Sequence, residues 1–174
     1  MAPEDMRVRP TSDKVRQAIF NILEHADFGE FTIAGARVAD LFAGTGAMGI
    51  EAISRGAAFC TFIDDAADSR ALIHQNVEAL GLNGVTKIWR RDATALGRAM
   101  DRYALVFLDA PYRKGLTEAA LVSLRDGGWL APAAVIVAET ATDEDRPSTD
   151  GFSVADERIY GETRVMFLRP GLPA

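Results

Sequence analysis

The tetrapeptide Asp109-Ala110-Pro111-Tyr112 combines residue types that can hold an amino group attached to an aromatic ring. Such an amine is a poor nucleophile because its lone pair is delocalised into the ring. A carboxylate and a backbone carbonyl that accept its two N–H bonds favour a geometry in which the lone pair is localised. Asp109 offers the carboxylate and Ala110 the carbonyl, while Pro111 stiffens the backbone. The Tyr112 ring offers a face on which a base can stack, so the motif predicts a clamp for a nucleobase amine.

The reaction that suits this clamp is methyl transfer from a sulfonium donor. Because a sulfonium carries its own leaving group, in-line attack needs alignment and approach at about 3 Å more than it needs a strong base. Asp109 could take up the proton after the transfer. Taken alone, however, the four residues could also be a turn that ends a strand.

Three glycines, Gly44, Gly46 and Gly49, satisfy the pattern G-x-G-x-x-G directly after the apolar run 37–42. Missing side chains in such a turn let a ligand approach the backbone, so the pattern predicts a nucleotide-binding turn. The glycines alone do not select among NAD, FAD and S-adenosylmethionine. They are also compatible with a tight structural turn that holds no ligand.

Acidic residues at the ends of three predicted strands narrow the choice of cofactor. Asp40 stands four residues before the first glycine, where it could meet the ammonium group of a methionine moiety and would repel a pyrophosphate. Asp64 could accept both ribose hydroxyls, which NAD and S-adenosylmethionine share. Asp92, followed by Ala93, could accept the adenine amino group, although it could equally cap a following helix.

The hydrophobic pattern predicts the α/β scaffold that these residues need. A capped amphipathic helix is predicted over residues 11–26, with Ser12 as its cap. Buried strands are predicted at 37–42, 60–64, 85–92, 103–109 and 134–140. Helices are predicted between them, at 50–56, 66–80, 94–100 and 116–124. This alternation predicts a mostly parallel, doubly wound sheet, with the apolar run 103–109 as a central strand.

Smaller features complete the predicted fold. In the helix 66–80, the residues expected to face inward are Leu72, Ile73, Val77 and Leu80. Residues 127–132 are predicted to form a turn and the polar residues 142–151 a loop. Two strand-like stretches, 152–160 and 163–169, predict a C-terminal antiparallel hairpin that joins the sheet.

Composition favours one folded domain without a metal site. The chain has 174 residues, with a hydrophobic fraction of 48% and a charged fraction of 25%. Cys60 is the one cysteine, so it has no partner for an internal disulfide and is expected to pack in a strand. With His25 and His74 as the two histidines, no zinc constellation is expected. Neither a membrane span nor a signal peptide is evident, so we expect a cytoplasmic location.

The formal net charge of −6 argues against a general positive field for nucleic acid, so any contact with RNA must be local. The basic residues form small groups that could contact phosphates or could be ordinary solvated surface. These groups are Arg7, Arg9, Lys14 and Arg16, then Arg90 with Arg91, and then Arg113 with Lys114.

In their order and spacing, four segments resemble the RsmD-type 16S ribosomal RNA guanine-N2 methyltransferases. The segments are RPTSDKVRQAIFNIL (9–23), DLFAGTGAMGIEAISRGA (40–57), DAPYRKG (109–115) and GGWLAP (127–132). The resemblance covers nearly the whole chain. It implies a Rossmann-like class I methyltransferase with a seven-stranded sheet, S-adenosylmethionine as methyl donor, and a guanine N2 amine of small-subunit rRNA as acceptor.

The resemblance also implies a role for each motif residue. Asp109 to Tyr112 would be catalytic, and Asp64 would hold the ribose. The adenine would be reached by Asp92 and Ala93. The methionine part would be lined by Asp40, Ala43, Gly44 and Gly46, and Phe42 is also expected to bind the cofactor. The expected partner is 16S rRNA or a 30S assembly intermediate, bound by a monomer without metal or membrane, with Arg7, Arg9, Lys14, Arg16, Arg113 and Lys114 as RNA contacts.

Three departures from the family pattern matter. Ala110 replaces the first proline of the usual D-P-P-[FY] motif, so we expect a functional but less rigid loop. Asp64 stands where glutamate is more common, and Ala66 occupies a place that is commonly acidic. Members usually begin with a short basic β-hairpin before R-P-T, whereas this chain starts almost at that motif. The missing hairpin is expected to be an RNA-binding element. We therefore expect either that the chain is truncated or that its substrate recognition is weaker.

Other functions remain open at this point. Related clamps also serve methylation of adenine N6 in DNA and of protein glutamine. A NAD-dependent oxidoreductase is suggested by the glycine pattern and Asp64, but Asp40 and the absence of an evident hydride-handling residue argue against it. A catalytically inactive RNA-binding or assembly module is suggested by Ala110 and the short N-terminus.

Overall fold

Seven strands form one sheet in the computed structural model, which describes residues 12–171. Their order across the sheet is β3-β2-β1-β4-β5-β7-β6. The parallel strands are β1 (Arg37–Leu41), β2 (Phe59–Ile63), β3 (Thr86–Trp89), β4 (Tyr103–Leu108) and β5 (Leu130–Ala141). The predicted hairpin is confirmed: β7 (Thr163–Pro170) pairs antiparallel with β5, and β6 (Phe152–Tyr160) forms the outer edge.

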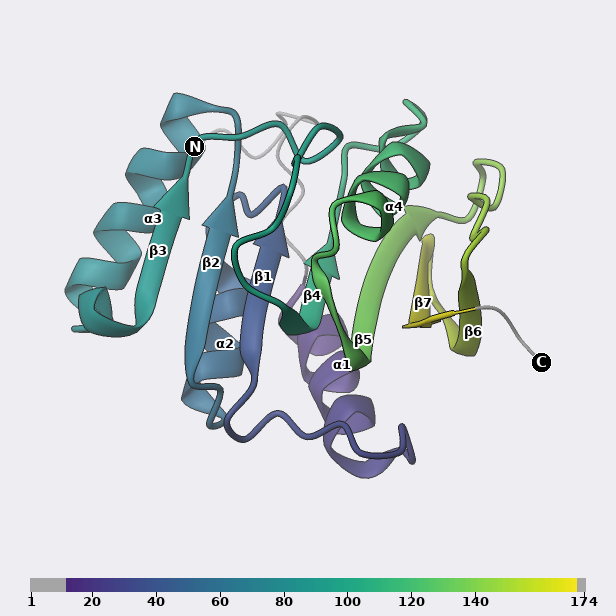
Figure 1. Cartoon of the computed structure of the whole chain (residues 1–174), viewed down its shortest axis with the longest axis horizontal. Helices are drawn as coiled ribbons and strands as arrows, with labels where there is room; N and C mark the ends of the chain where they lie inside the picture. Colours follow the sequence, from purple (N-terminus) through teal and green to yellow (C-terminus); the bar gives the residue numbers. More distant parts are fainter. Residues whose placement is uncertain (1–11, 172–174) are drawn as a thin grey trace.

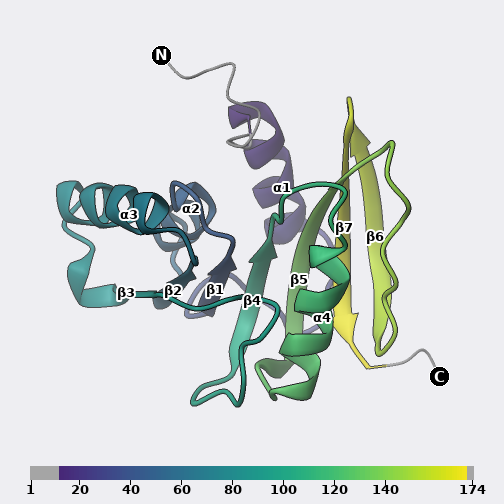
Figure 2. The same cartoon turned by 90° about the horizontal axis from the view of Figure 1, so that it is seen from above.

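Helices cover both faces of the sheet, which confirms the predicted doubly wound α/β fold (Figures 1 and 2). One face carries α1 (Asp13–His25), α2 (Ala47–Ser54) and α3 (Ala67–Ala79), and the other carries α4 (Leu116–Asp126). Because strand side chains alternate between faces, Val38 and Leu105 join the core under α1 to α3, whereas Ala39 and Val106 join the core under α4. The carboxyl ends of the parallel strands meet along one edge, where loops are free to hold ligands.

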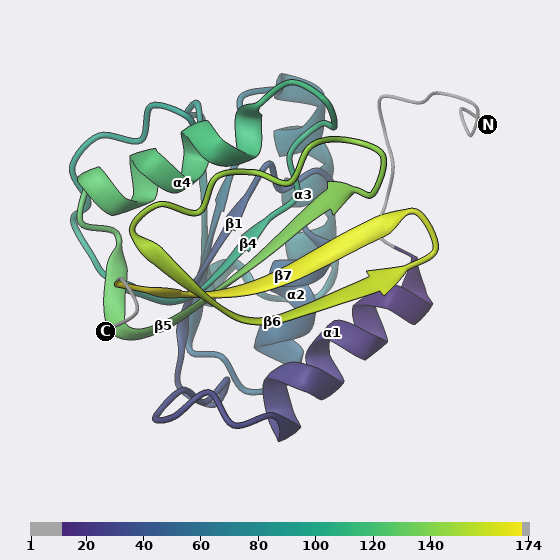
Figure 3. The same ribbon diagram turned by 90° about the vertical axis from the view of Figure 1, so that its right-hand side faces the viewer.

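The first helix is held by the contacts that its sequence predicts. The hydroxyl of Ser12 accepts the amide hydrogen of Val15 at 3.2 Å, which caps α1. Its buried face packs Ile19, Phe20 and Leu23 against the sheet. Arg55 of the turn after α2 lies over the Phe20 ring and pairs with Glu24, which joins α1 to α2. Figure 3 shows α1 and α4 on opposite sides of the C-terminal hairpin.

The predicted helix at 94–100 is wrong, because the structure has turns there. Gly97 has a φ of 75°, which interrupts a right-handed helix. Contacts from the end of α4 hold the segment instead: Ser123 accepts the amide hydrogen of Leu96 at 2.7 Å, and the Trp129 indole donates to the Gly97 carbonyl at 2.8 Å. Long-range hydrogen bonds therefore replace the local helix.

Two inward positions predicted for α3 are also wrong. Ile73 and Val77 are buried, but Leu72 is 39% exposed and Leu80 is 60% exposed. Since α3 covers only the outer part of the sheet near β2 and β3, a narrow stripe of the helix suffices to cover it.

Several element boundaries also differ from the prediction. The helix α2 begins at Ala47, inside the glycine pattern, and β5 begins at Leu130, inside the predicted turn 127–132. Cys60 is fully buried in β2, as expected. Within residues 12–171, none of the helices combines the length and apolar character that a bilayer crossing needs.

The close approach of α2 to β2 yields a prediction about stability. A Cβ added at Gly49 would lie 2.5 Å from both Cys60 Sγ and Phe62 Cε1, which are themselves buried. We expect Gly49→Ala to lower the free energy of unfolding by about 1–3 kcal/mol, because the packed core has no room for the methyl group. Urea denaturation measures this loss. Gly84→Ala is the matched control, since nothing lies within 4 Å of its added Cβ; equal stability losses in both variants would contradict this account.

Candidate active site

The carboxyl ends of β1, β2 and β4 bring three acidic side chains close together. Leu41 pairs with Leu108, so Asp109 follows β4 beside the start of the glycine turn. Asp40 pairs with Phe107, so Asp109 lies two residues further along the chain, directly after the last residue of β4. The negative charges of Asp109 and Asp64 both act on Asp40. The predicted cofactor turn and the predicted catalytic motif therefore share one edge.

Two carboxylates hold the glycine turn from opposite sides. Asp40 Oδ2 accepts the Gly49 amide hydrogen at 3.0 Å, inside the first turns of α2. Asp64 Oδ2 accepts the Gly44 amide hydrogen, also at 3.0 Å. Gly44 and Gly46 have positive φ values of 59° and 81°, which only glycine adopts easily. The turn is thus a rigid link between β1 and α2.

Asp40 is almost completely enclosed, with 4% of its surface exposed. Burial raises the pKa of its carboxyl group well above the usual range, and the nearby Asp109 and Asp64 charges add to this increase. The hydrogen bond from Gly49 acts in the opposite direction. A cation placed nearby would favour the ionised form, so Asp40 is electrostatically prepared for a positive ligand.

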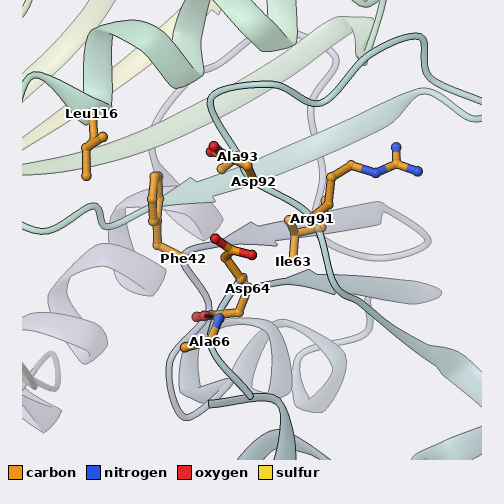
Figure 4. A pocket seen from close by; sticks show the side chains of 9 residues that line it. Phe42, Ile63, Asp64, Ala66, Arg91, Asp92, Ala93 and Leu116 are labelled. Atoms are coloured by element: carbon orange, nitrogen blue, oxygen red, sulfur yellow. Dashed lines mark hydrogen bonds between the residues drawn. The ribbon is translucent and has the colours of Figure 1, made fainter. Parts of the chain in front are cut away.

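A cavity of about 370 Å³ opens beside the glycine turn (Figure 4), within the range typical of small-molecule sites. Its lining comes from the end of β1, the end of β2, the segment after β3 and the start of α4. The lining residues are Phe42, Ile63, Asp64, Asp65, Ala66, Arg91, Asp92, Ala93 and Leu116.

Four of the expected cofactor residues line this cavity, namely Phe42, Asp64, Asp92 and Ala93. The other four are not among its lining residues: Asp40 lies in β1, and Ala43, Gly44 and Gly46 lie in the glycine turn. Sequence reasoning missed the remaining lining residues. Most of these flank Asp64 or Asp92 and could have been found from that adjacency. Leu116 carried no local signal, because only the fold brings the start of α4 to this place.

Asp92 combines the two roles that its sequence context left open. Its Oδ1 atom accepts the Thr94 amide hydrogen at 2.8 Å and the Thr94 hydroxyl at 2.7 Å. These hydrogen bonds lower the pKa of Asp92. The carboxylate therefore closes a turn rather than a helix, and it lines the cavity at the same time.

The Asp109 motif forms the loop between β4 and α4. Asp109 and Tyr112 are partly buried, Pro111 is exposed and Ala110 is 3% exposed. Packing around Ala110 restrains the backbone at this position. The loop ends at Gly115, whose φ of 67° leads into α4.

The expected RNA-contacting residues have different surroundings. Lys14 and Lys114 are exposed, whereas Arg16 pairs with Asp13 at 2.7 Å and with Glu51 at 3.7 Å. Arg113 pairs with Asp143. Arg7 and Arg9 lie outside the described residues. Of the remaining basic pair, Arg90 is exposed. Arg91 lies over the Trp89 ring and lines the cavity beside the glycine turn.

Comparison with known proteins agrees with this geometry. The family model described as conserved hypothetical protein 95 matches residues 1–169. The ribosomal RNA small subunit methyltransferase D of Escherichia coli K12 is 35% identical over 162 residues, which are 92% of this chain and 78% of the relative. The Bacillus subtilis protein YlbH is 36% identical over 162 residues, covering 90% of this chain and 85% of the relative.

Solved structures show the same fold. The Escherichia coli protein yhhF superposes with a TM-score of 0.78 at 30% identity, covering 95% of this chain and 89% of that one. With the family match and the curated relatives, this identifies the chain as a member of the conserved hypothetical protein 95 family, the RsmD-type family of small-subunit rRNA methyltransferases.

Proposed function

We propose that the protein transfers the methyl group of S-adenosylmethionine to the exocyclic N2 amine of a guanine in 16S rRNA. The observation that carries the proposal is the meeting of the cavity beside the glycine turn with the Asp109 motif at one edge of the sheet. The name of the Escherichia coli relative, ribosomal RNA small subunit methyltransferase D, supports the choice of substrate.

The residues around the cavity fit this cofactor. Asp64 keeps acceptor capacity for ribose hydroxyls beyond its bonds to the Gly44 and Ala66 amides, since a carboxylate has about four acceptor sites. Phe42 and Leu116 offer apolar surface for the adenine, and Asp92 can accept its amino group. Asp40 and the glycine turn would hold the methionine part. When bound, S-adenosylmethionine supplies a methyl group activated by a positively charged sulfur.

The electrostatics favour this cofactor over NAD. A pyrophosphate placed at the glycine turn would face the charges of Asp64 and Asp109. A cationic sulfonium and an ammonium group are attracted by these two carboxylates and favour the ionised form of Asp40. The acidic cluster therefore disfavours the oxidoreductase alternative.

The chain's own residues would act by positioning. Asp109 and the Ala110 carbonyl would accept the two N–H bonds of the amine, while Tyr112 stacks on the base. Asp109 would then hold the proton that the amine loses. The burial of Ala110 would keep its carbonyl in place although a proline is absent at this position.

The proposed substrate is 16S rRNA within a 30S assembly intermediate, bound by a monomer in the cytoplasm, where ribosomes assemble. Local contacts would come from exposed basic residues such as Lys14 and Lys114, because the net charge of −6 opposes a general attraction to RNA.

Labelled S-adenosylmethionine and 30S particles from cells that lack the activity test the proposal. We expect label in 16S rRNA, and mass spectrometry should map it to a guanine N2 position. Free rRNA, adenine-containing DNA and a glutamine peptide serve as competing acceptors. A protein that binds S-adenosylhomocysteine in calorimetry but labels only DNA or peptide would overturn the choice of acceptor, and binding of NADH alone would overturn the reaction.

Asp109→Ala should lower kcat by about 10²–10⁴-fold, because the amine loses both an orienting acceptor and a proton acceptor. The affinity for S-adenosylhomocysteine should stay nearly unchanged, since Asp109 is not among the residues that line the cofactor cavity. Asp109→Asn keeps one acceptor for the amine but removes the negative charge, so it separates the orienting role of Asp109 from its role as proton acceptor. Equal losses in kcat and cofactor affinity would show that Asp109 acts on cofactor binding instead.

Asp40 should make stability depend on pH. Its pKa is raised on folding, so the folded protein binds more protons than the unfolded chain between the ordinary aspartate value of 3.8 and the raised value. The free energy of unfolding therefore falls as the pH rises through this window. Asp40→Asn keeps an acceptor for Gly49 but removes the titration. Urea denaturation from pH 4 to 8 should show the variant gaining stability relative to the original chain as the pH rises. If the free energies of unfolding of the two proteins changed with pH in parallel, the raised pKa of Asp40 would be refuted.

Tyr112→Phe should retain activity because stacking needs only the ring. Tyr112→Ala should raise KM for the RNA substrate by roughly 5- to 150-fold, the equivalent of losing a stacking contact of about 1–3 kcal/mol. Steady-state kinetics with 30S particles measure both variants. An inactive Phe variant would assign a role to the hydroxyl group.

A further inference from the structure

The loop that carries the proposed catalytic motif is joined to the segment 142–150, which connects β5 to β6. The Arg113 amide donates to Glu144 Oε2 at 2.7 Å. The Arg113 guanidinium donates to both carboxylate oxygens of Asp143, each at 2.5 Å. One residue of the loop thus uses its backbone and its side chain to reach two neighbouring acids.

The backbone at Arg113 adopts a conformation that favours this contact. Its φ is 65°, in the left-handed region where residues other than glycine are uncommon. Phe42 is the other such residue within the described chain, and it lines the cofactor cavity. Residues in sparsely populated conformations persist where surrounding contacts hold them, and they gather at functional sites. The hydrogen bonds to Asp143 and Glu144 are contacts of this kind.

The segment 142–150 is itself attached at several points. The Thr142 amide donates to the Glu162 carbonyl at 2.9 Å in the β6–β7 turn. The Ser148 amide donates to Glu118 Oε1 at 2.8 Å, on the first turn of α4, and Pro147 is buried. Arg125, at the end of α4, donates to the Asp150 carbonyl at 2.9 Å. These hydrogen bonds fix the segment 142–150, so its contacts can restrain the neighbouring loop 109–115.

The position of the loop affects both halves of the site. Leu116 directly follows the loop and lines the cofactor cavity. It also lines a second cavity of about 470 Å³ between the loop and the segment 142–147. At the other end of the loop stands Asp109, after the last residue of β4. A shift at Arg113 would therefore move the base clamp relative to the cofactor.

We propose that Arg113 is a positioning residue, which together with Asp143 and Glu144 holds the loop 109–115 in the geometry that aligns the acceptor amine with the methyl donor. This inference rests on the proposed function, and it replaces the expectation that Arg113 contacts RNA phosphates. Lys114, which is exposed beside it, keeps that expected role.

The contact of Arg113 with Asp143 and Glu144 determines the geometry of the loop 109–115 and contributes little to the stability of the whole protein. The Arg113 and Asp143 side chains are 56% and 62% exposed, and exposed ion pairs contribute little to folding. Removing the contact should leave the thermal midpoint nearly unchanged. Misplacement of reacting groups by about 1 Å costs on the order of a hundredfold in rate, so turnover is the sensitive measurement.

The kinetic test compares four variants on 30S particles with labelled S-adenosylmethionine. Arg113→Gly keeps the left-handed backbone and removes the guanidinium, and Glu144→Ala removes the acceptor for the Arg113 amide. Both should lower kcat by about tenfold to a hundredfold, with KM for 30S and the affinity for S-adenosylhomocysteine nearly unchanged. Glu144→Gln retains an acceptor and should recover most of the turnover. Asp145→Ala removes the adjacent exposed acid and should match the original chain.

Salt dependence separates positioning from RNA contact. If Arg113 bound a phosphate, Arg113→Gly would raise KM, keep kcat and reduce the slope of log affinity against log salt by about 1. That result would overturn the proposal. Lys114→Ala is expected to show this phosphate pattern.

Hydrogen exchange of the peptide spanning 109–116 tests the contact even if no RNA is methylated. Exchange should speed up in Glu144→Ala and return to the original rate in Glu144→Gln. Faster exchange together with absent methylation by every variant and by the original chain would refute the proposed function while keeping the contact. Identical exchange in Glu144→Ala and the original chain would overturn the positioning role.

Discussion

The hydrogen bond from the Gly49 amide to the buried Asp40 carboxylate ties together the parts on which the site depends. Asp40 is the next-to-last residue of β1, and Gly49 lies in α2, so the bond fixes the glycine turn between them. Gly49 can approach because it has no side chain, and the place of a Cβ is taken by Cys60 and Phe62. The cavity for the cofactor therefore lies where backbone packing leaves little freedom.

The same arrangement concentrates negative charge. Asp40, Asp64 and Asp109 lie in or directly after three neighbouring strands, and the charges of Asp64 and Asp109 act on Asp40. Three carboxylates close together disfavour an anionic ligand and favour a cationic one. Asp64 bonds to the Gly44 amide and Asp40 to the Gly49 amide, so the acids that would attract the cofactor also hold the turn beneath it.

The loop 109–115 is held by tertiary contacts more than by its own sequence. Ala110 lacks the stiffness of a proline, but it is buried. At the other end of the loop, Arg113 is joined to Asp143 and Glu144 from a segment about thirty residues later in the chain. Such a loop can keep its geometry while its sequence departs from the family pattern.

Much of the scaffold could be predicted from the sequence, because apolar periodicity and turn residues are local signals. They located the strands, the Ser12 cap of α1 and the C-terminal hairpin. The motif spacing also brought Asp64 and Asp92 to one cavity, since parallel strands present their carboxyl ends to one edge. Asp64 directly follows β2, whereas Asp92 lies three residues after the end of β3.

Tertiary structure decided what depends on distant partners. Residues 94–100 form turns because Ser123 and Trp129 bind them, and Leu72 stays exposed because α3 covers only the outer strands. Leu116 reaches the cofactor cavity, and Arg113 finds its acids, through the path of the chain after β4 and β5. A sequence pattern reports on neighbours along the chain, whereas these contacts join residues that only folding brings within reach.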